Sequence, residues 1–550
     1  MRISIAQLNY HIGNFTKNKE LICNAIGKAR AEGSDLVIFS ELSVPGYPPL
    51  DLLDHYDFVE KCNATVLEIA KECVGIAAIV GAPTINRNQK GKKLYNSALL
   101  LSEGKITFTA NKALLPTYDI FDEYRYFEPE TTFSLLTFKG LKIALTICED
   151  LWDEQLFDNE FEKSRLYSIS PMDELARKKP DIIINISASP FSYTRIESRK
   201  DIFRNKAIKY KIPVISVNQI GANTELIFDG ASMVINRNGE IYHQLPFFEE
   251  TIYTFSPDEI INDLGTSDIL KPDPSELIKK ALITGISDYF SKMNFKRGII
   301  GLSGGIDSAV CLCLAAEAIG NENVMALLLP SRYSSEHSVS DALKLADNLG
   351  VKYEIINIEK PFTAFEEVLS PIFAGMARDV TEENIQARVR AVLLMAVANK
   401  SGYILLNTSN KSEAAVGYGT LYGDMAGGLS IIGDVYKTDV YKLAGYINRN
   451  KEIIPSNIIN KAPSAELRPG QFDTDSLPEY KILDSILYQY IELQKPVSYI
   501  ISSGYDEVLV EKVLKMINSN EYKRYQAPPV LRISSKAFGA GRRMPLVAKY

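Results

Sequence analysis

Cysteine, histidine and tryptophan are scarce in this chain of 550 residues, with six, four and one copies. The cysteines are scattered along the sequence, at Cys23, Cys62, Cys73, Cys148, Cys311 and Cys313. Their spacing fits neither a disulfide framework nor a zinc site. No histidines are paired, so a histidine-based metal site is not expected either. A chain without disulfides is expected in a reducing compartment, the cytoplasm.

Long apolar runs and a strong charge of either sign are also missing. No run is long enough to span a bilayer, and the first eight residues alternate like a strand rather than a secretory signal. The net charge of −7 gives no reason to expect a nucleic acid or a membrane as partner. The chain is 46% hydrophobic and 23% charged, which is typical of a globular protein, and its length predicts two or more domains.

Strand-like runs alternate with helical patterns throughout, which predicts an α/β fold. In the first half, strands are expected at 36–40, 75–81, 97–101, 142–147, 181–186 and 213–217, and helices at about 16–31, 52–72 and 164–178. In the second half, strands are expected near 297–302, 323–329, 352–357 and 403–407. A polar, proline-bearing stretch at 263–274 predicts a linker between domains at 1–262 and 275–550. Ser275 suits the N-cap of a helix that runs to about Met293.

A glycine-rich turn follows the apolar run at 298–300 and precedes a helical run at 306–319. It reads Gly301, Leu302, Ser303, Gly304, Gly305, Ile306, Asp307 and Ser308. Backbone N–H groups of such a turn, with the helix N-terminus, form a site for a pyrophosphate or another anion. Asp307 adds a carboxylate where a divalent metal would sit. Two glycines alone would fit an ordinary turn, but the full string resembles the signature of the ATP pyrophosphatases.

Three reactive residues follow predicted strands in the first half: Glu41, Lys112 and Cys148. Residues at the carboxyl ends of strands line the usual active-site edge of an α/β fold. A thiol nucleophile, a carboxylate base and a cation for the oxyanion together suit attack on an amide. Each also has an ordinary explanation: a buried small cysteine, a helix-capping glutamate and a surface lysine.

The text around these three residues resembles the nitrilase superfamily in order and spacing over about residues 1–260. The matching segments are Phe39-Ser40-Glu41-Leu42, Asn111-Lys112-Ala113-Leu114-Leu115-Pro116 and Cys148-Glu149-Asp150. The resemblance implies an αββα sandwich and an amide-hydrolysing triad of Glu41, Lys112 and Cys148. It also implies glutamine-binding roles for Tyr118, Glu123, Ser189 and Arg195.

A nitrilase-like domain fused to an ATP-pyrophosphatase domain resembles the glutamine-dependent NAD synthetases. The second half supports this with Leu329-Pro330-Ser331-Arg332, Thr381-Glu382-Glu383-Asn384 and Asn407-Thr408-Ser409-Asn410-Lys411-Ser412-Glu413. The resemblance implies a doubly wound parallel sheet in this half. It places Thr408 at ATP, Asn384, Glu413 and Lys523 at deamido-NAD, and Asp307 with Glu413 at Mg²⁺. Ammonia-using relatives carry a lysine before the Gly-Asp at 423–424, where this chain has Tyr422, so that role cannot be carried over.

The implied reaction amidates deamido-NAD to NAD, with ATP as co-substrate, Mg²⁺ as cofactor and glutamine as the source of ammonia. The resemblance also implies a homo-oligomer. Since ammonium is not a nucleophile, the two-site chemistry predicts a closed passage for ammonia. Three alternatives stay open: an ATP pyrophosphatase with another carboxyl acceptor, a nitrilase-type hydrolase with a nucleotide-sensing module, and a non-catalytic binding protein.

Overall fold

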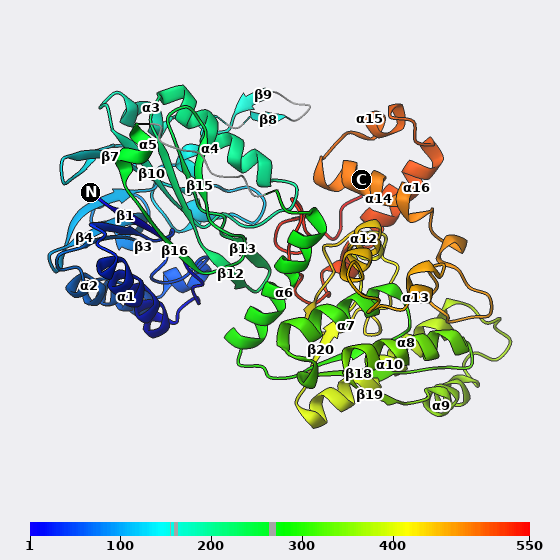
Figure 1. Ribbon diagram of the computed structural model, residues 1–550. Coiled ribbons are helices and arrows are strands. Elements are labelled where there is room, and N and C mark those ends of the chain that lie inside the picture. The colour runs from blue at the N-terminus through cyan, green and yellow to red at the C-terminus, as the bar shows by residue number, and fades with distance from the viewer. Residues whose placement is uncertain (155, 159–162, 263–270, 550) are drawn as a thin grey trace. The chain divides into compact units, whose positions relative to one another are not determined.

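The computed structural model of the chain describes residues 1–154, 156–158, 163–262 and 271–549 (Figure 1). The chain divides into two compact units, Met1–Pro272 and Asp273–Tyr550, each with its own hydrophobic core. Residues 263–270, most of the predicted linker, lie outside the described residues. Within the described part of the chain, no helix is long and apolar enough to cross a bilayer.

Two six-stranded sheets form the centre of the first unit. From edge to edge, one sheet contains β16 (Thr251–Phe255), β1 (Ile3–Gln7), β2 (Leu36–Ile38), β3 (Ala77–Ile85), β4 (Leu94–Ser102) and β5 (Lys105–Asn111). The other contains β15 (Ile241–Gln244), β14 (Met233–Ile235), β11 (Val214–Asn218), β10 (Ile182–Ser187), β7 (Leu141–Ile147) and β6 (Leu136–Phe138).

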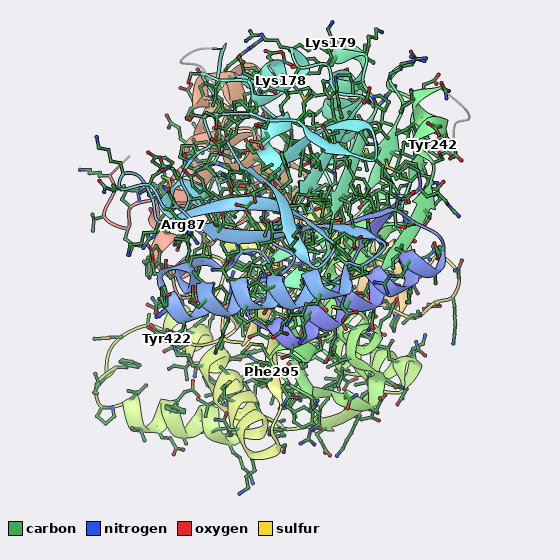
Figure 2. The ribbon with its side chains drawn as sticks, turned by 90° about the vertical axis from the view of Figure 1, so that its left-hand side faces the viewer. Arg87, Lys178, Lys179, Tyr242, Phe295 and Tyr422 are labelled. Atoms are coloured by element: carbon green, nitrogen blue, oxygen red, sulfur yellow. The ribbon has the colours of Figure 1, made fainter. Side chains whose placement is uncertain are left out.

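The two sheets pack face to face, with helices on their outer faces. Alternate residues of a strand point to opposite faces, so Leu36 and Ile38 join the core between the sheets, whereas Val37 packs toward the helices. The helices α1 (Phe15–Ala31) and α2 (Tyr56–Glu72) cover the first sheet, and α3 (Pro171–Ala176) and α4 (Ile196–Tyr210) cover the second. The predicted αββα sandwich is therefore confirmed. Lys178 and Lys179, which follow α3, lie exposed at the surface of this unit (Figure 2).

Two local predictions for the first unit were wrong in part, and one hairpin was missed. The helix expected at 164–178 is confined to α3, because Ser170 caps it by accepting a hydrogen bond from the Asp173 N–H at 3.2 Å and Pro171 is its first residue. The helix expected at 52–72 is divided at His55, whose backbone is extended, into a 3₁₀ turn, η1 (Leu50–Asp54), and α2. The hairpin of β12 (Ile220–Asn223) and β13 (Leu226–Asp229) was not predicted. The unit also contains η2 (Glu123–Arg125), η3 (Cys148–Leu151), β8 (Leu156–Asp158), β9 (Lys163–Arg165) and α5 (Pro257–Ile261).

The second unit contains a five-stranded parallel sheet, which confirms the predicted fold class. Its order is β19 (Lys352–Ile355), β18 (Val324–Leu328), β17 (Gly298–Gly301), β20 (Ile404–Asn407) and β21 (Leu429–Ser430). Chain order reverses between β17 and β20, and ligands of doubly wound sheets bind beyond the strand ends at such a point. Ile299 of β17 packs with Val389 and Ala398 of α10 (Val380–Ser401).

Helices surround this sheet and continue beyond it. They are α6 (Pro274–Lys292), α7 (Ile306–Ile319), α8 (Glu336–Leu349), α9 (Glu359–Leu369), α11 (Lys411–Val416), α12 (Lys437–Ile447), α13 (Ser456–Asn460), α14 (Tyr480–Leu487), α15 (Val497–Ser502), α16 (Glu507–Ser519) and α17 (Glu521–Arg524). Four of them, α11 and α14 to α16, share a second apolar cluster. The N-cap of α6 is Asp273, whose carboxylate accepts a hydrogen bond from the Ser275 N–H at 2.7 Å, so the expected Ser275 cap was wrong.

Candidate active sites

Cys148 lies at a sharp turn directly after β7. Its φ of 43° is left-handed, a conformation that costs a non-glycine residue energy and is concentrated at functional sites. The side chain is buried among the first unit's core residues. Burial raises the pKa of the Cys148 thiol well above its ordinary value, the Glu41 carboxylate adds to this, and the Lys112 ammonium opposes it. The thiol therefore needs a base to become a nucleophile.

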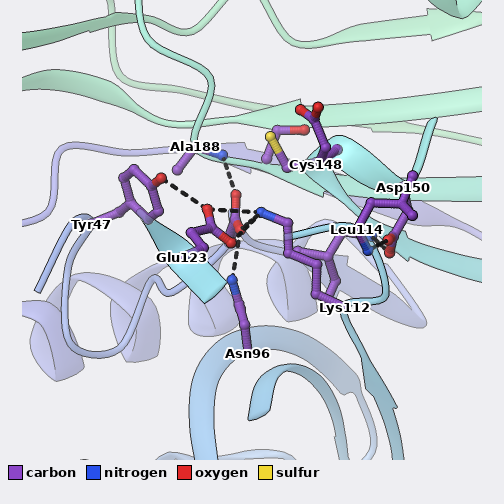
Figure 3. A network of polar contacts seen from close by, with 12 residues as sticks. Tyr47, Asn96, Lys112, Leu114, Glu123, Cys148, Asp150 and Ala188 are labelled. Atoms are coloured by element: carbon purple, nitrogen blue, oxygen red, sulfur yellow. Dashed lines mark hydrogen bonds and ion pairs between the residues drawn. The ribbon is translucent and has the colours of Figure 1, made fainter. Parts of the chain in front are cut away.

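Glu41 and Lys112 form a fully buried ion pair beside Cys148 (Figure 3). The Lys112 Nζ donates to Glu41 Oε1 at 2.7 Å. The side-chain amide of Asn96 donates to the same oxygen at 2.8 Å, and the Ala188 N–H donates to Glu41 Oε2 at 3.0 Å. The structure thus brings together the three residues that the sequence analysis placed at strand ends.

Glu123 belongs to the same cluster. Lys112 donates to its Oε1 at 2.9 Å, and the Tyr47 hydroxyl donates to that oxygen at 2.9 Å. Burial raises the pKa of Glu123 to about 7, against the opposing charge of Lys112. Burial also lowers the pKa of Lys112, but Glu123 and Glu41 outweigh it and hold that pKa well above its ordinary value. Lys112 is therefore a charged ammonium between two carboxylates.

A third carboxylate, Glu149, directly follows Cys148 and was not singled out from the sequence. The hydroxyls of Tyr118 and Tyr167 both donate to its Oε1, at 2.9 and 2.8 Å. Burial raises the pKa of Glu149, and these two hydrogen bonds and Lys112 oppose the shift. The expected glutamine-binding Tyr118 therefore lies beside the Cys148 turn.

The other two expected glutamine contacts lie on the segment that follows β10. Asn218, at the end of β11, accepts the Ser189 N–H at 2.9 Å and donates to the Ser189 carbonyl at 3.2 Å. Arg195 is the exposed N-cap residue of α4. Within the described ranges, the Arg195 side chain forms no hydrogen bond or ion pair with the Glu41 cluster.

In the second unit, the glycine-rich turn connects β17 to α7. Gly304 has a φ of 78°, and a Cβ there would lie 2.3 Å from the Ser338 carbonyl oxygen, so the turn requires glycine. The Ser303 hydroxyl accepts the Gly305 N–H at 3.2 Å, and the Ser308 hydroxyl donates to the Gly305 carbonyl at 3.0 Å. These bonds fix a turn at the N-terminus of α7, where an anion is stabilised by backbone N–H groups and the helix dipole.

Asp307 and Glu413 meet at one ammonium group, that of Lys437. Lys437 forms an ion pair with Asp307 and lies 3.4 Å from Glu413 Oε1. Asn410 donates to Asp307 Oδ1 at 3.0 Å. Burial raises the pKa of Glu413 to about 8, and Lys437 opposes the shift. Thr408 follows β20, the strand that neighbours β17, so it lies at the same edge of the sheet.

Asn384 and Lys523 both reach the segment that follows α11. The Thr420 hydroxyl donates to Asn384 Oδ1 at 2.7 Å. Lys523 donates to the carbonyls of Gly417 and Gly419 at 2.7 and 2.8 Å. The structure therefore gathers these two residues, which are far apart in sequence, around residues 417–420.

Comparison with known proteins covers both units. The model of the carbon-nitrogen hydrolase family matches residues 2–258, and that of the NAD synthase family matches residues 278–527. A glutamine-dependent NAD(+) synthetase from Synechocystis is 42% identical over all of this chain and 99% of the relative. One from Thermotoga maritima is 39% identical over all of this chain and 99% of the relative. The chain belongs to the glutamine-dependent NAD(+) synthetase family.

Solved structures of this family agree. The glutamine-dependent NAD+ synthetase of Acinetobacter baumannii, in complex with ADP, is 36% identical, covers 99% of this chain and 98% of its own, and has a TM-score of 0.77. The one from Cytophaga hutchinsonii covers all of this chain and 98% of its own, with a TM-score of 0.83. Its 21% identity supports the fold alone. As a family member, the chain is a ligase with a nitrilase-superfamily unit and an NAD synthase unit.

Sequence reasoning missed several residues of this NAD synthetase family member that the structure places at the two sites. They are Tyr47, Asn96, Glu149 and Tyr167 in the first unit, and Asn410 and Lys437 in the second. Glu149 adjoins Cys148, and Asn410 lies between Thr408 and Glu413, so both were within segments already singled out. No local sequence pattern distinguishes Asn96 or Lys437. Their contacts depend on strand register and on the packing of helices that are far apart in sequence.

Proposed function

We propose that this chain converts deamido-NAD to NAD in two half-reactions, one in each unit. The observation that carries the proposal is the buried cluster of Glu41, Lys112, Glu123 and Cys148 within a chain that also contains the Ser303–Ser308 turn. We assign glutamine hydrolysis to residues 1–262 and amide formation to residues 275–550. The ADP complex of the Acinetobacter baumannii relative supports nucleotide binding by such a chain.

In the first half-reaction, the Cys148 thiol gives its proton to Glu41 and attacks the side-chain amide carbon of glutamine. Lys112 stabilises the negative charge that develops on the amide oxygen. The carbon–nitrogen bond breaks, Glu41 returns the proton to the leaving nitrogen, and ammonia departs. Water then hydrolyses the thioester and releases glutamate. The charged state of Lys112, held by two carboxylates, supports its electrostatic role.

Glutamine recognition requires an acid for its α-ammonium and a cation for its α-carboxylate. Glu149 is the better placed acid, because its carboxylate accepts from two neutral tyrosine hydroxyls, whereas Glu123 is paired with the Lys112 ammonium. Tyr118 orients the Glu149 carboxylate, and the backbone of Ser189 is held by Asn218. Arg195 supplies the cation. We keep Glu123 in the proposed site, where it fixes the Lys112 ammonium.

In the second half-reaction, a carboxylate oxygen of deamido-NAD attacks the α-phosphorus of ATP. The bond to the β-phosphate breaks, and pyrophosphate leaves toward the N–H groups of the Ser303–Ser308 turn. Ammonia then attacks the adenylated carbonyl carbon, and AMP leaves. Thr408 contacts ATP, whereas Asn384, Glu413 and Lys523 contact deamido-NAD.

Two carboxylates near the Ser303–Ser308 turn, which we call the phosphate turn, fit Mg²⁺. This ion is usually held by one or two carboxylates together with substrate phosphates and water. Asp307 and Glu413 supply two carboxylates that face one cation, and among the described residues no larger group of metal-binding side chains occurs. When bound, Mg²⁺ neutralises charge on the phosphates as pyrophosphate departs. Lys437 adds a positive charge from the chain itself.

Two features of the proposal rest on resemblance and composition. The family resemblance predicts a homo-oligomer, which light scattering would test. All six cysteines are free, which supports a reducing, cytoplasmic location. The net charge of −7 is the ground on which we expect no nucleic acid or membrane partner.

The first experiment measures NAD formation from deamido-NAD, ATP and Mg²⁺, with glutamine or ammonium as nitrogen source. We expect Cys148→Ala to lose the glutamine reaction and keep the ammonium reaction. If native protein forms no NAD from either source, the acceptor is another carboxylate. If Cys148→Ala keeps the glutamine reaction, the assigned nucleophile is wrong.

A further inference from the structure

The catalytic carboxylate proposed above has almost all of its hydrogen-bonding capacity in use. Each carboxylate oxygen has two lone pairs, so the group accepts about four hydrogen bonds. Two donors, Asn96 Nδ2 and Lys112 Nζ, occupy Oε1 of Glu41 at 2.8 and 2.7 Å. The Ala188 N–H occupies one position on Oε2 at 3.0 Å. Among the residues that the structure describes, this leaves one free lone pair, on Oε2.

A base must have a free lone pair toward the proton that it takes. Cys148 lies in the same cluster as Lys112 (Figure 3), and the charge of the Glu41 carboxylate, which Lys112 binds, raises the pKa of the Cys148 thiol. With Oε1 saturated, the thiol proton goes to Oε2. The S–H bond breaks, an O–H bond forms on Oε2, and the electron pair stays on sulfur.

Asn96 is placed to hold the Glu41 carboxylate in this orientation, because its amide donates to Oε1. It lies on β4, its side chain is fully buried, and its backbone carbonyl accepts the Lys112 N–H at 2.8 Å. The same residue therefore anchors the chain at Lys112 and orients Glu41. In the described part of the chain no donor reaches its own buried amide oxygen, and a buried polar atom left without a partner costs free energy.

We propose that Asn96 is a positioning residue for glutamine hydrolysis: it saturates Oε1 of Glu41 so that Oε2 receives the Cys148 proton. This rests on the glutaminase role proposed for the first unit. Asn96 does not contact the substrate. Its loss lowers kcat for the glutamine reaction and leaves the KM for glutamine and the ammonium reaction unchanged.

The test compares Asn96→Leu with Asn236→Leu, an asparagine that directly follows β14 and is also buried. The Asn236 amide also donates to a glutamate, Glu240, at 2.8 Å, but that glutamate lies outside the cluster. With ATP, Mg²⁺ and deamido-NAD present, we expect Asn96→Leu to lower kcat about 10- to 100-fold, less than Glu41→Gln, which removes the base altogether. Asn236→Leu keeps kcat within about twofold of the native value.

A pH series separates positioning from mere packing. Asn96→Asp is isosteric, and its carboxyl can donate a hydrogen bond to Glu41 only while it is protonated. The ratio of the Asn96→Asp rate to the Asn96→Leu rate should therefore rise as the pH falls from about 8 to about 6. The same ratio for Asn236→Asp and Asn236→Leu should not change.

Three results would overturn the inference: a native kcat for Asn96→Leu, an equal loss of the glutamine and ammonium reactions, or a pH-independent ratio. Cys148→Ala, assayed in parallel, separates these from failure of the proposed function. If Cys148→Ala keeps the glutamine reaction, the glutaminase assignment itself is wrong. If Cys148→Ala loses it and the Asn96 variants behave like native protein, only the positioning role is wrong.

Discussion

Arg199 and Asp229 form a buried, bidentate ion pair in the first unit, and breaking it should be costly. Arg199 lies on α4 and Asp229 on β13, and their two hydrogen bonds measure 2.8 and 2.6 Å. Their side chains are only 8% and 0% exposed. Arg199→Met leaves the Asp229 carboxylate buried and unpaired, and such a change costs about 3–5 kcal/mol.

Trp152 makes this loss measurable for the first unit alone. It is the one tryptophan of the chain and directly follows the Cys148–Leu151 turn. Unfolding in urea would be followed by Trp152 fluorescence. For a unit of this size the free energy of unfolding falls by about 3 kcal/mol per molar urea, so the midpoint should fall by about 1–2 M.

Two comparisons show whether the buried charge is the cause. Arg177→Met breaks the exposed pair with Glu174, whose side chains are 71% and 49% exposed, and should cost at most about 1 kcal/mol. The double variant Arg199→Met with Asp229→Asn removes both charges and should recover most of the loss. Equal midpoints for Arg199→Met and Arg177→Met, or a double variant no better than the single one, would refute the reasoning.

Two further predictions concern the phosphate turn and the Cys148 turn. Gly304→Ala places a Cβ 2.3 Å from the Ser338 carbonyl oxygen at a φ of 78°, so ammonium-dependent NAD formation should fall at least about 10-fold; native activity would contradict this. Burial raises the pKa of Asp150 to about 6, whereas its pKa in the unfolded chain is about 3.9. Between these two pH values the folded chain keeps a proton that the unfolded chain has released. The stability of the first unit should therefore fall by about 3 kcal/mol between about pH 4 and pH 6 on account of this group. Asp150→Asn should remove that part of the slope when unfolding is followed by Trp152 fluorescence, and an unchanged slope would contradict the assignment.

Glu41, Lys112 and Cys148 show how much of the proposed site could be predicted from the sequence. Strand periodicity placed Glu41, Lys112 and Cys148 at the ends of strands, and the structure brings the three together. The fold class followed from strand-like runs that alternate along the chain with helical patterns. Resemblance added the two-unit architecture, which the family matches confirm.

Contacts that depend on tertiary packing could not be predicted from the sequence. Asn96 reaches Glu41 only because β4 lies between β3 and β5 in the sheet. Lys437 comes to Asp307 from 130 residues away. Glu123 was expected at the substrate, but whether it faces substrate or Lys112 depends on how the segment after β5 folds back. Spacing along the chain does not determine any of these.

The left-handed backbone at Cys148 ties chemistry to a loss of stability. A residue with a Cβ at a φ of 43° costs about 1–3 kcal/mol, a cost that glycine does not carry. The nucleophile that we propose cannot be glycine, so with Cys148 in this role the first unit accepts a less stable turn. A change made for stability alone would place glycine at this position, which agrees with a chemical role for the thiol.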